Sequence, residues 1–128
     1  MKLGYVILYV PDVAGAVAFY ENAFGVARRF VHESGQYAEM ETGATALAFA
    51  SEEMVASSHG FRRNRPHDEA AGAEVGFLVD DVPASFRRAI EAGAAPLVEP
   101  TVKAWGQMVS YVRDLNGFIV EICNPVTS

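Results

Sequence analysis

The stretch Trp105–Glu121, WGQMVSYVRDLNGFIVE, has the pattern of a β-hairpin. We predict one strand over residues 107–112 and a second over residues 118–123, joined by a tight turn. Gly117 is the residue type that best tolerates the positive φ angle of such a turn, and the Asp114 carboxylate is placed to accept hydrogen bonds from turn amides. This hairpin is the most clearly predicted element of the chain.

The second strand of this hairpin carries a charge in an apolar setting. Its faces alternate Phe118, Val120 and Ile122 with Ile119, Glu121 and Cys123. The Glu121 carboxylate points either to water or into a cavity where a charge has a use. The remainder of the chain favours the cavity.

Composition limits the class of protein. The 128 residues suffice for one domain with a core, and 51% of them are hydrophobic. Lys plus Arg number 10 against 16 Asp plus Glu, a net charge of −6, which argues against nucleic acid as a partner. Cys123 is the single cysteine, and no apolar run approaches membrane-spanning length. We therefore predict a cytoplasmic protein without a membrane partner.

The first half of the chain alternates strand and helix signals. Asp12 is a good N-cap for a helix that Gly25 ends. The predicted strands cover residues 5–10, 26–32, 37–41 and 45–50. From Ser51 to Gly72 the pattern is lost, apart from a helical turn near 52–56, so this segment is predicted to be a linker or lid.

The pattern then begins again. Val75-Gly76-Phe77-Leu78-Val79 aligns with Val6-Ile7-Leu8-Tyr9-Val10, and Asp81 takes the capping role of Asp12. A helix over 84–92, a strand from Leu97 and the hairpin complete a second β-α-β-β-β unit. We predict an α+β fold in which a single domain, residues 1–128, comprises a module at 1–56, a linker or lid at 57–72 and a module at 73–124.

Strand alternation also predicts which face of each sheet is buried. The large apolar residues that suit packing under a helix are Val6, Leu8, Val10, Val75, Phe77 and Val79. The opposite face mixes small, aromatic and acidic residues, as ligand pockets do. We predict that a pocket is built from Tyr5, Ile7, Tyr9, Ala48, Glu74, Leu78, Trp105, Ser110 and Glu121.

The chain resembles the vicinal oxygen chelate superfamily, the glyoxalase, bleomycin resistance protein and dioxygenase fold. The resemblance spans nearly the whole chain and rests on YVPDVAGAVAFYENAFG, VGFLVDDVPASFRRAIEAGA and WGQMVSYVRDLNGFIVEI. It implies that the tandem β-α-β-β-β modules form a cup-shaped mixed sheet and that the protein assembles as a homodimer around a small-molecule ligand.

The resemblance also implies a metal site. Its ligand positions map to Tyr5, Ala48, Glu74 and Glu121, of which Ala48 has no donor atom. An oxygen-rich remainder suits Mg²⁺ or Mn²⁺ better than Zn²⁺ or Ni²⁺. The cofactor is thus either a divalent metal or none.

The carboxylates Glu74 and Glu121 are expected to face each other across one cup. Like charges in a partly dry site need compensation, which leaves three readings. A metal sits between them, or one carboxyl stays protonated and the pair moves substrate protons as catalytic residues, or they are a polar patch in a binding cavity.

These readings correspond to different functions. We expect a small-molecule-binding protein of the glyoxalase and bleomycin-resistance type. One version is a lyase or isomerase, such as a lactoylglutathione lyase-type enzyme, with an incomplete metal site. The alternative is a metal-free resistance protein that sequesters an antibiotic.

Overall fold

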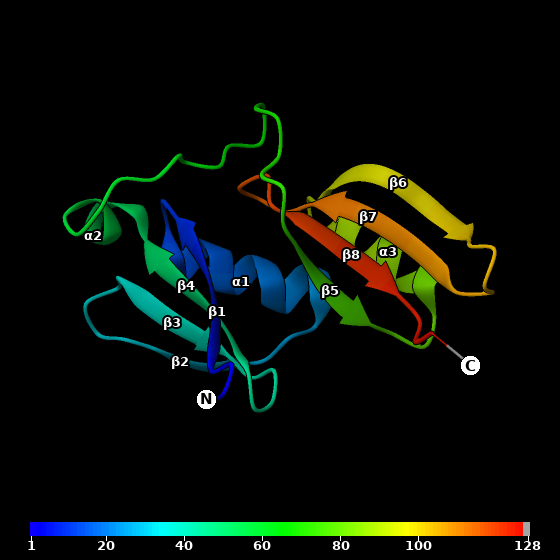
Figure 1. The fold of residues 1–128 in the computed structure, drawn as a ribbon, viewed down its shortest axis with the longest axis horizontal. Helices are drawn as coiled ribbons and strands as arrows, with labels where there is room; N and C mark the ends of the chain where they lie inside the picture. Colours follow the sequence, from blue (N-terminus) through cyan, green and yellow to red (C-terminus); the bar gives the residue numbers. More distant parts are fainter. Residues whose placement is uncertain (127–128) are drawn as a thin grey trace. The chain divides into compact units, whose positions relative to one another are not determined.

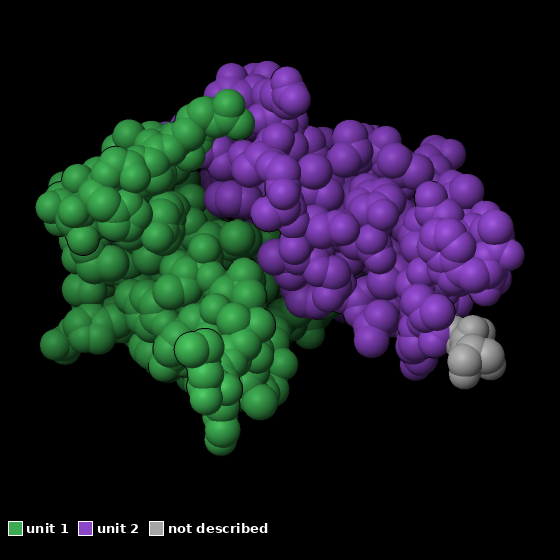
Figure 2. All heavy atoms as spheres, viewed as in Figure 1, with its two compact units in different colours: residues 1–63 green, residues 64–128 purple. Residues whose placement is uncertain are grey.

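Two four-stranded mixed sheets of the same topology form the fold, which confirms the predicted α+β class and its internal repeat (Figure 1). The computed structural model describes residues 1–126. Residues 1–63 form one unit and residues 64–128 a second (Figure 2). In both units the first strand pairs in parallel with the last, and the remaining pairs are antiparallel.

The first unit has the strand order β1-β4-β3-β2. Its elements are β1 Tyr5–Val10, α1 Val13–Phe24, β2 Arg28–Val31, β3 Tyr37–Met40, β4 Ala46–Ser51 and α2 Glu52–Ala56. The apolar face of α1 packs on β3 and β4, where the Tyr20 ring meets the Phe49 ring at 4.9 Å between centroids. This packing buries the Leu47 and Phe49 face of β4 as predicted, but Val6 of the edge strand β1, which was predicted to lie under a helix, is 41% exposed.

The second unit repeats this order as β5-β8-β7-β6. Its elements are β5 Glu74–Leu78, α3 Val82–Glu91, β6 Ala95–Val102, β7 Met108–Arg113 and β8 Ile119–Cys123. Strand β6 contains Pro96 and Pro100, which an edge strand tolerates because part of its backbone needs no ladder partner. Helix α3 packs on β6, β7 and β8 (Figure 1).

The capping residues act as predicted. The Asp12 side chain accepts a hydrogen bond from the Gly15 amide at 3.1 Å, and the Asp81 side chain accepts one from the Ala84 amide at 3.0 Å. Gly25 ends α1 with a φ of 67°, in the left-handed region that favours glycine. Helices α1 and α3 therefore start at matching points after the first strand of their units.

The turn between β7 and β8 is held by Asp114. One carboxylate oxygen accepts hydrogen bonds from the Asn116 and Phe118 amides, both at 2.9 Å. Gly117 has a φ of 90°, and a Cβ atom there would lie 2.6 Å from the Arg65 carbonyl oxygen. Glycine is required by both conformation and space.

The segment between α2 and β5 is anchored in its second part. The buried Asn64 amide donates to the Asn116 carbonyl at 3.1 Å, and the Arg113 guanidinium donates to the Arg65 carbonyl at 3.1 Å. These bonds tie residues 64 and 65 to the hairpin of their own unit. The second part of this segment is thus fixed to the second unit.

No helix among residues 1–126 combines the length and apolar character that crossing a membrane requires.

Candidate functional site

The two carboxylates predicted to form the site lie on neighbouring strands of the second unit. Glu74 begins β5, and Glu121 is central in β8, where it pairs with Gly76. Because side chains alternate along a strand, Glu74, Gly76 and Glu121 share one face of the sheet. The carboxylates are therefore side by side on one sheet rather than opposed across a cup, which corrects that expectation.

A hollow of about 370 Å³ opens on this face. It is lined by Gly72, Ala73, Glu74, Leu97, Val98, Tyr111 and Ile119. Tyr111 pairs directly with Glu121 across β7 and β8, so Glu121 is flanked by two lining residues, Tyr111 and Glu74. The hollow has apolar walls and one acidic corner, within the size range of small-molecule pockets.

Electrostatics couples the acidic groups of this corner. Burial raises the pKa of Glu74, and the charge of Glu121 and a hydrogen-bond interaction with it add to the effect. Hydrogen bonding to Glu121, with burial, raises the pKa of Tyr111 to about 12. Burial first, then Glu121, raises the pKa of the Cys123 thiol to about 11. Each group thus resists acquiring negative charge beside Glu121.

No cation within the described residues offsets this corner. None of the ion pairs seen between described residues involves Glu74 or Glu121, and Arg113, on the same face opposite Ile119, donates to the Gly117 and Arg65 carbonyls instead. An acidic cluster beside apolar walls, without an internal counter-ion, attracts a cation from solution. The arrangement is suited to binding positive charge.

The matching positions of the first unit hold different chemistry. Tyr5 occupies the place of Glu74, and Ala48, fully buried, occupies the place of Glu121. Ala48 pairs with Glu39 as Glu121 pairs with Tyr111. The first unit therefore has its carboxylate one strand further along.

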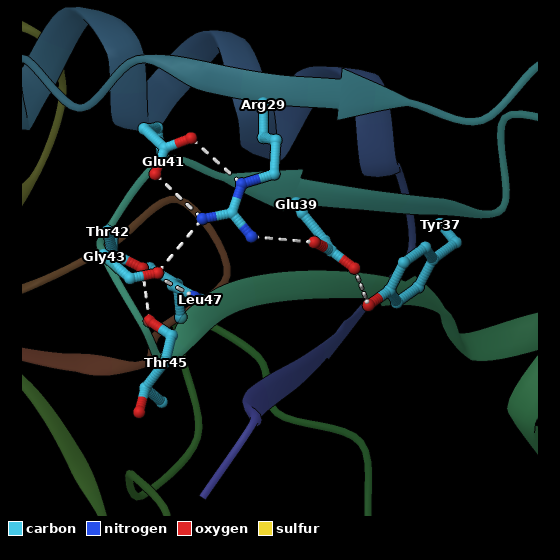
Figure 3. A network of polar contacts seen from close by, with 8 residues as sticks. All are labelled: Arg29, Tyr37, Glu39, Glu41, Thr42, Gly43, Thr45 and Leu47. Atoms are coloured by element: carbon cyan, nitrogen blue, oxygen red, sulfur yellow. Dashed lines mark hydrogen bonds and ion pairs between the residues drawn. The ribbon is translucent and has the colours of Figure 1, made fainter.

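That carboxylate is neutralised within the unit. Arg29 donates to Glu39 at 3.2 Å and, through two nitrogens, to Glu41 at 2.8 and 3.0 Å (Figure 3). The Tyr37 hydroxyl donates to the other oxygen of Glu39 at 2.8 Å. Burial and this hydrogen bond raise the pKa of Tyr37 to about 12, and the bonds from Arg29 lower the pKa of Glu41.

Sequence comparison decides the family. The model of the Glyoxalase/Bleomycin resistance protein/Dioxygenase superfamily matches residues 2–122. The chain belongs to this superfamily. Membership supports a small-molecule-binding or enzyme-like protein.

One sequence relative and two solved structures resemble this chain over most of its length. The uncharacterized protein YraH of Bacillus subtilis (strain 168) is 27% identical over 124 residues, covering 95% of this chain and 97% of that protein. A glyoxalase-related enzyme from Fulvimarina pelagi superposes with a TM-score of 0.82 at 20% identity, over 97% of this chain and 88% of that one. TioX from Micromonospora sp. ML1 gives 0.72 at 23%, over 97% and 98%.

The metal site implied by the superfamily does not fit these residues. Ala48 has no donor atom and is fully buried, so one of the four expected ligand positions is lost. Among the described residues, no group of at least three His, Cys, Asp or Glu side chains could hold a metal ion. Glu74 and Glu121 supply carboxylate oxygens alone, which is half of a usual set.

The other predicted pocket residues are divided between the units. Ile7 and Tyr9 line a separate hollow of the first unit. Tyr5, on the same strand, is exposed and does not line that hollow. Leu78 is exposed on the Glu74 face of β5. Trp105 is exposed after β6, and its indole nitrogen donates to the Gln107 side chain at 2.9 Å. Of the predicted set, the structure brings Glu74 together with Glu121 in the second unit and Ile7 together with Tyr9 in the first.

The prediction that Ser110 lines the pocket is wrong. It is fully buried, pairs with Ile122 on the helix-covered face, and its hydroxyl donates to the Ile122 carbonyl at 2.9 Å. Its neighbour Tyr111 lies on the Glu121 face instead and was missed. The direct pairing of Tyr111 with Glu121 across the hairpin is the signal that would have identified it.

Proposed function

We propose that this superfamily member binds a small organic cation, a protonated amine on an apolar body, in the hollow of the second unit. The observation that supports this proposal is the Glu74–Glu121 pair, which has no ion-pair partner within the described residues. The role is that of a binding protein, for which sequestering a cationic antibiotic is one form.

The lining offers a complementary surface for each part of such a ligand. The positive group lies against Glu74 and Glu121, whose mutual repulsion it relieves. The face of Tyr111 adds a cation–π contact, worth about 1 kcal/mol in partly exposed sites. Leu97, Val98 and Ile119 cover the apolar body.

A second candidate function uses the same carboxyl groups for catalysis. The raised pKa of Glu74 beside Glu121 is the pattern of a proton-transfer pair. In this version one carboxyl takes a proton from carbon or oxygen of a bound substrate and the other returns it, without a metal. Binding of the cation precedes this step in either case.

Calorimetric titration with a charge-matched pair of probes tests the proposal. We expect 1-naphthylmethylamine, protonated at neutral pH, to bind with a heat that Glu121→Gln reduces, and the heat of 1-naphthylmethanol to be the same in the parent and in Glu121→Gln. Glu121→Gln and Glu74→Gln should each weaken amine binding about tenfold, because each removes one ion–ion contact.

The matched control is Glu91→Gln, the same charge change at an exposed site on α3. It should leave the amine affinity within about twofold. Equal loss in all three variants would reduce the effect to net charge and overturn the proposal. Turnover of the amine or of a related carbonyl compound, abolished by Glu121→Gln, would favour the catalytic candidate.

A further inference from the structure

The first unit contains a second hollow, of about 300 Å³, whose chemistry differs from that of the acidic one. Its lining residues are Ile7, Tyr9, Tyr37, Ala50, Met54, Val55, Ser58 and His59. They come from β1, β3, the end of β4, α2 and the residues that follow α2. No carboxylate, lysine or arginine is among them, so the hollow is neutral apart from the imidazole.

An aromatic cluster forms one wall. The Tyr9 ring meets the Phe61 ring edge-on at 5.0 Å and the His59 ring at 6.0 Å between centroids. Arg63 lies over Phe61 at 5.2 Å and pairs with the buried Glu52 at 3.5 Å. These contacts hold the half-buried ring of Phe61 and the exposed ring of His59 beside the Tyr9 ring of β1.

The wall also presents polar groups with unused hydrogen-bonding capacity. The His59 Nδ1 lies 3.0 Å from the Gly60 carbonyl oxygen, which can only accept, so Nδ1 carries the proton and Nε2 of the neutral ring is an acceptor. Within the described residues, the Tyr9 and Ser58 hydroxyls make no side-chain hydrogen bond. Tyr37 differs, because its hydroxyl is bonded to Glu39.

We infer that this hollow is a binding site for an uncharged planar aromatic molecule that carries a hydroxyl group. The ring packs between Tyr9 and Met54, whose thioether makes favourable contacts with aromatic rings. The ligand hydroxyl donates to His59 Nε2 and accepts from Ser58 or Tyr9. A charged ligand is disfavoured because no lining carboxylate or guanidinium compensates its desolvation.

This site is independent of the proposed function, because it lies in the other unit and selects an uncharged ligand rather than a cation. The same two probes therefore separate the claims. At about pH 8, where imidazole is neutral, the full chain is titrated with 1-naphthylmethanol and followed by ¹⁵N–¹H NMR. We expect the largest shifts at the amides of Tyr9, Met54, Ser58 and His59.

Two variants test the residues that carry the inference. Met54→Lys places a charge at the partly exposed rim and should weaken binding of 1-naphthylmethanol at least tenfold, whereas Leu3→Lys adds the same charge at an exposed position of the same unit and should not. His59→Phe keeps an aromatic ring and removes the acceptor. It should weaken 1-naphthylmethanol several-fold but leave 1-methylnaphthalene, which lacks the hydroxyl, unchanged.

The outcomes are decisive for this site and separate from the amine test. Shifts confined to Glu74, Tyr111 and Ile119, or an unchanged affinity in Met54→Lys, overturn the inference. Equal effects of His59→Phe on both naphthalenes overturn the hydrogen bond to Nε2 and with it the hydroxylated ligand class. Loss of amine binding in Glu121→Gln with 1-naphthylmethanol binding retained shows that the two sites stand or fall separately.

Discussion

The two units share a topology and treat the carboxylates on the sheet face away from the helix in opposite ways. In the first, Glu39 is bonded to Arg29 and Tyr37, and Arg29 also clamps Glu41 (Figure 3). In the second, Glu74 and Glu121 adjoin Tyr111 with no cation among the described residues. The same topology thus carries one internally neutralised sheet face and one whose carboxylates have no ion-pair partner within the described residues.

The difference depends on a few positions. Tyr5 and Ala48 replace the two carboxylates of the second unit, and Glu39 replaces Tyr111. Duplicated modules need retain only their core and caps to keep the fold, because the ligand-facing residues make little contribution to it. A functional difference between the units can therefore arise without any change in architecture.

Removing the internal cation gives the largest expected effect. Arg29→Met leaves Glu39 buried with its charge uncompensated, which we expect to cost about 2 kcal/mol of unfolding free energy. Urea unfolding measures it. Arg28→Met, which breaks an exposed pair with Glu21, is the control and should cost clearly less than Arg29→Met. Equal losses in the two variants would mean that Glu39 needs no cation.

The two carboxylates should respond to neutralisation with opposite signs. Glu39→Gln loses charged hydrogen bonds to Arg29 and Tyr37 and should cost about 1 kcal/mol. Glu121→Gln removes repulsion with Glu74, while the new side-chain carbonyl can still accept a hydrogen bond from the Tyr111 hydroxyl, so the fold should be slightly stabilised. Thermal unfolding of both variants tests this contrast. Destabilisation by Glu121→Gln would show that the interaction of its carboxylate with Tyr111 outweighs its repulsion with Glu74.

The pH dependence of stability follows from the raised pKa values. A raised pKa gives stability below the unfolded-state value that is lost as pH rises through the folded-state value. For Glu74, stability should increase as pH falls from neutral towards the ordinary carboxyl pKa of 4.5. As the pH is lowered from about 7 to about 5, towards the carboxyl range, the thermal unfolding midpoint of the parent should rise. The midpoint of Glu74→Gln should rise less. A parallel change in both would exclude Glu74 as the cause.

Tyrosine ionisation affects both units in the same direction. The pKa of Tyr111 and that of Tyr37 are raised from 10.0 to about 12, so stability should fall between these values as the unfolded chain ionises first. Tyr111→Phe and Tyr37→Phe should each flatten part of this fall in unfolding midpoint. A variant that leaves the slope unchanged identifies a tyrosine that ionises equally in both states.

Divalent metals should have the smallest effect. With two carboxylates as the only charged donors, we expect Mg²⁺ and Mn²⁺ to bind with dissociation constants of about 1 mM or weaker. At that concentration the gain in stability is about 0.4 kcal/mol. Thermal shift with each ion, in the parent and in Glu121→Gln, measures it. Micromolar binding that Glu121→Gln abolishes would restore the metal site.

Much of the fold could be predicted because its signals are local. Asp12, Asp81 and Gly25 act within one helical turn, and the repeat was visible as matching strand and cap residues. The face of β7 could not be read in this way, because Val109 and Val112 are both buried on opposite faces and leave no alternation. The pairing with β8 decides which side chains of β7 share a face with Glu121. It places Tyr111 there and Ser110 on the opposite face.

The candidate site was predicted in part for the same reason. Glu74 and Glu121 are polar residues inside apolar strands, an anomaly that a sequence displays directly. The neutral hollow of the first unit depends instead on residues that follow α2, whose position is set by ring contacts with Tyr9. Such contacts have no periodic pattern and emerge only from the packed structure.

The close approach of Gly117 to the Arg65 backbone limits where a fragment containing the second unit can begin. A fragment that starts at the first residue of β5 would lack residues 64 and 65, depriving Asn116 and Arg113 of hydrogen-bond partners. It would also lack Gly72 and Ala73, part of the wall of the acidic hollow. A half-length version intended to keep its ligand should therefore begin at Asn64.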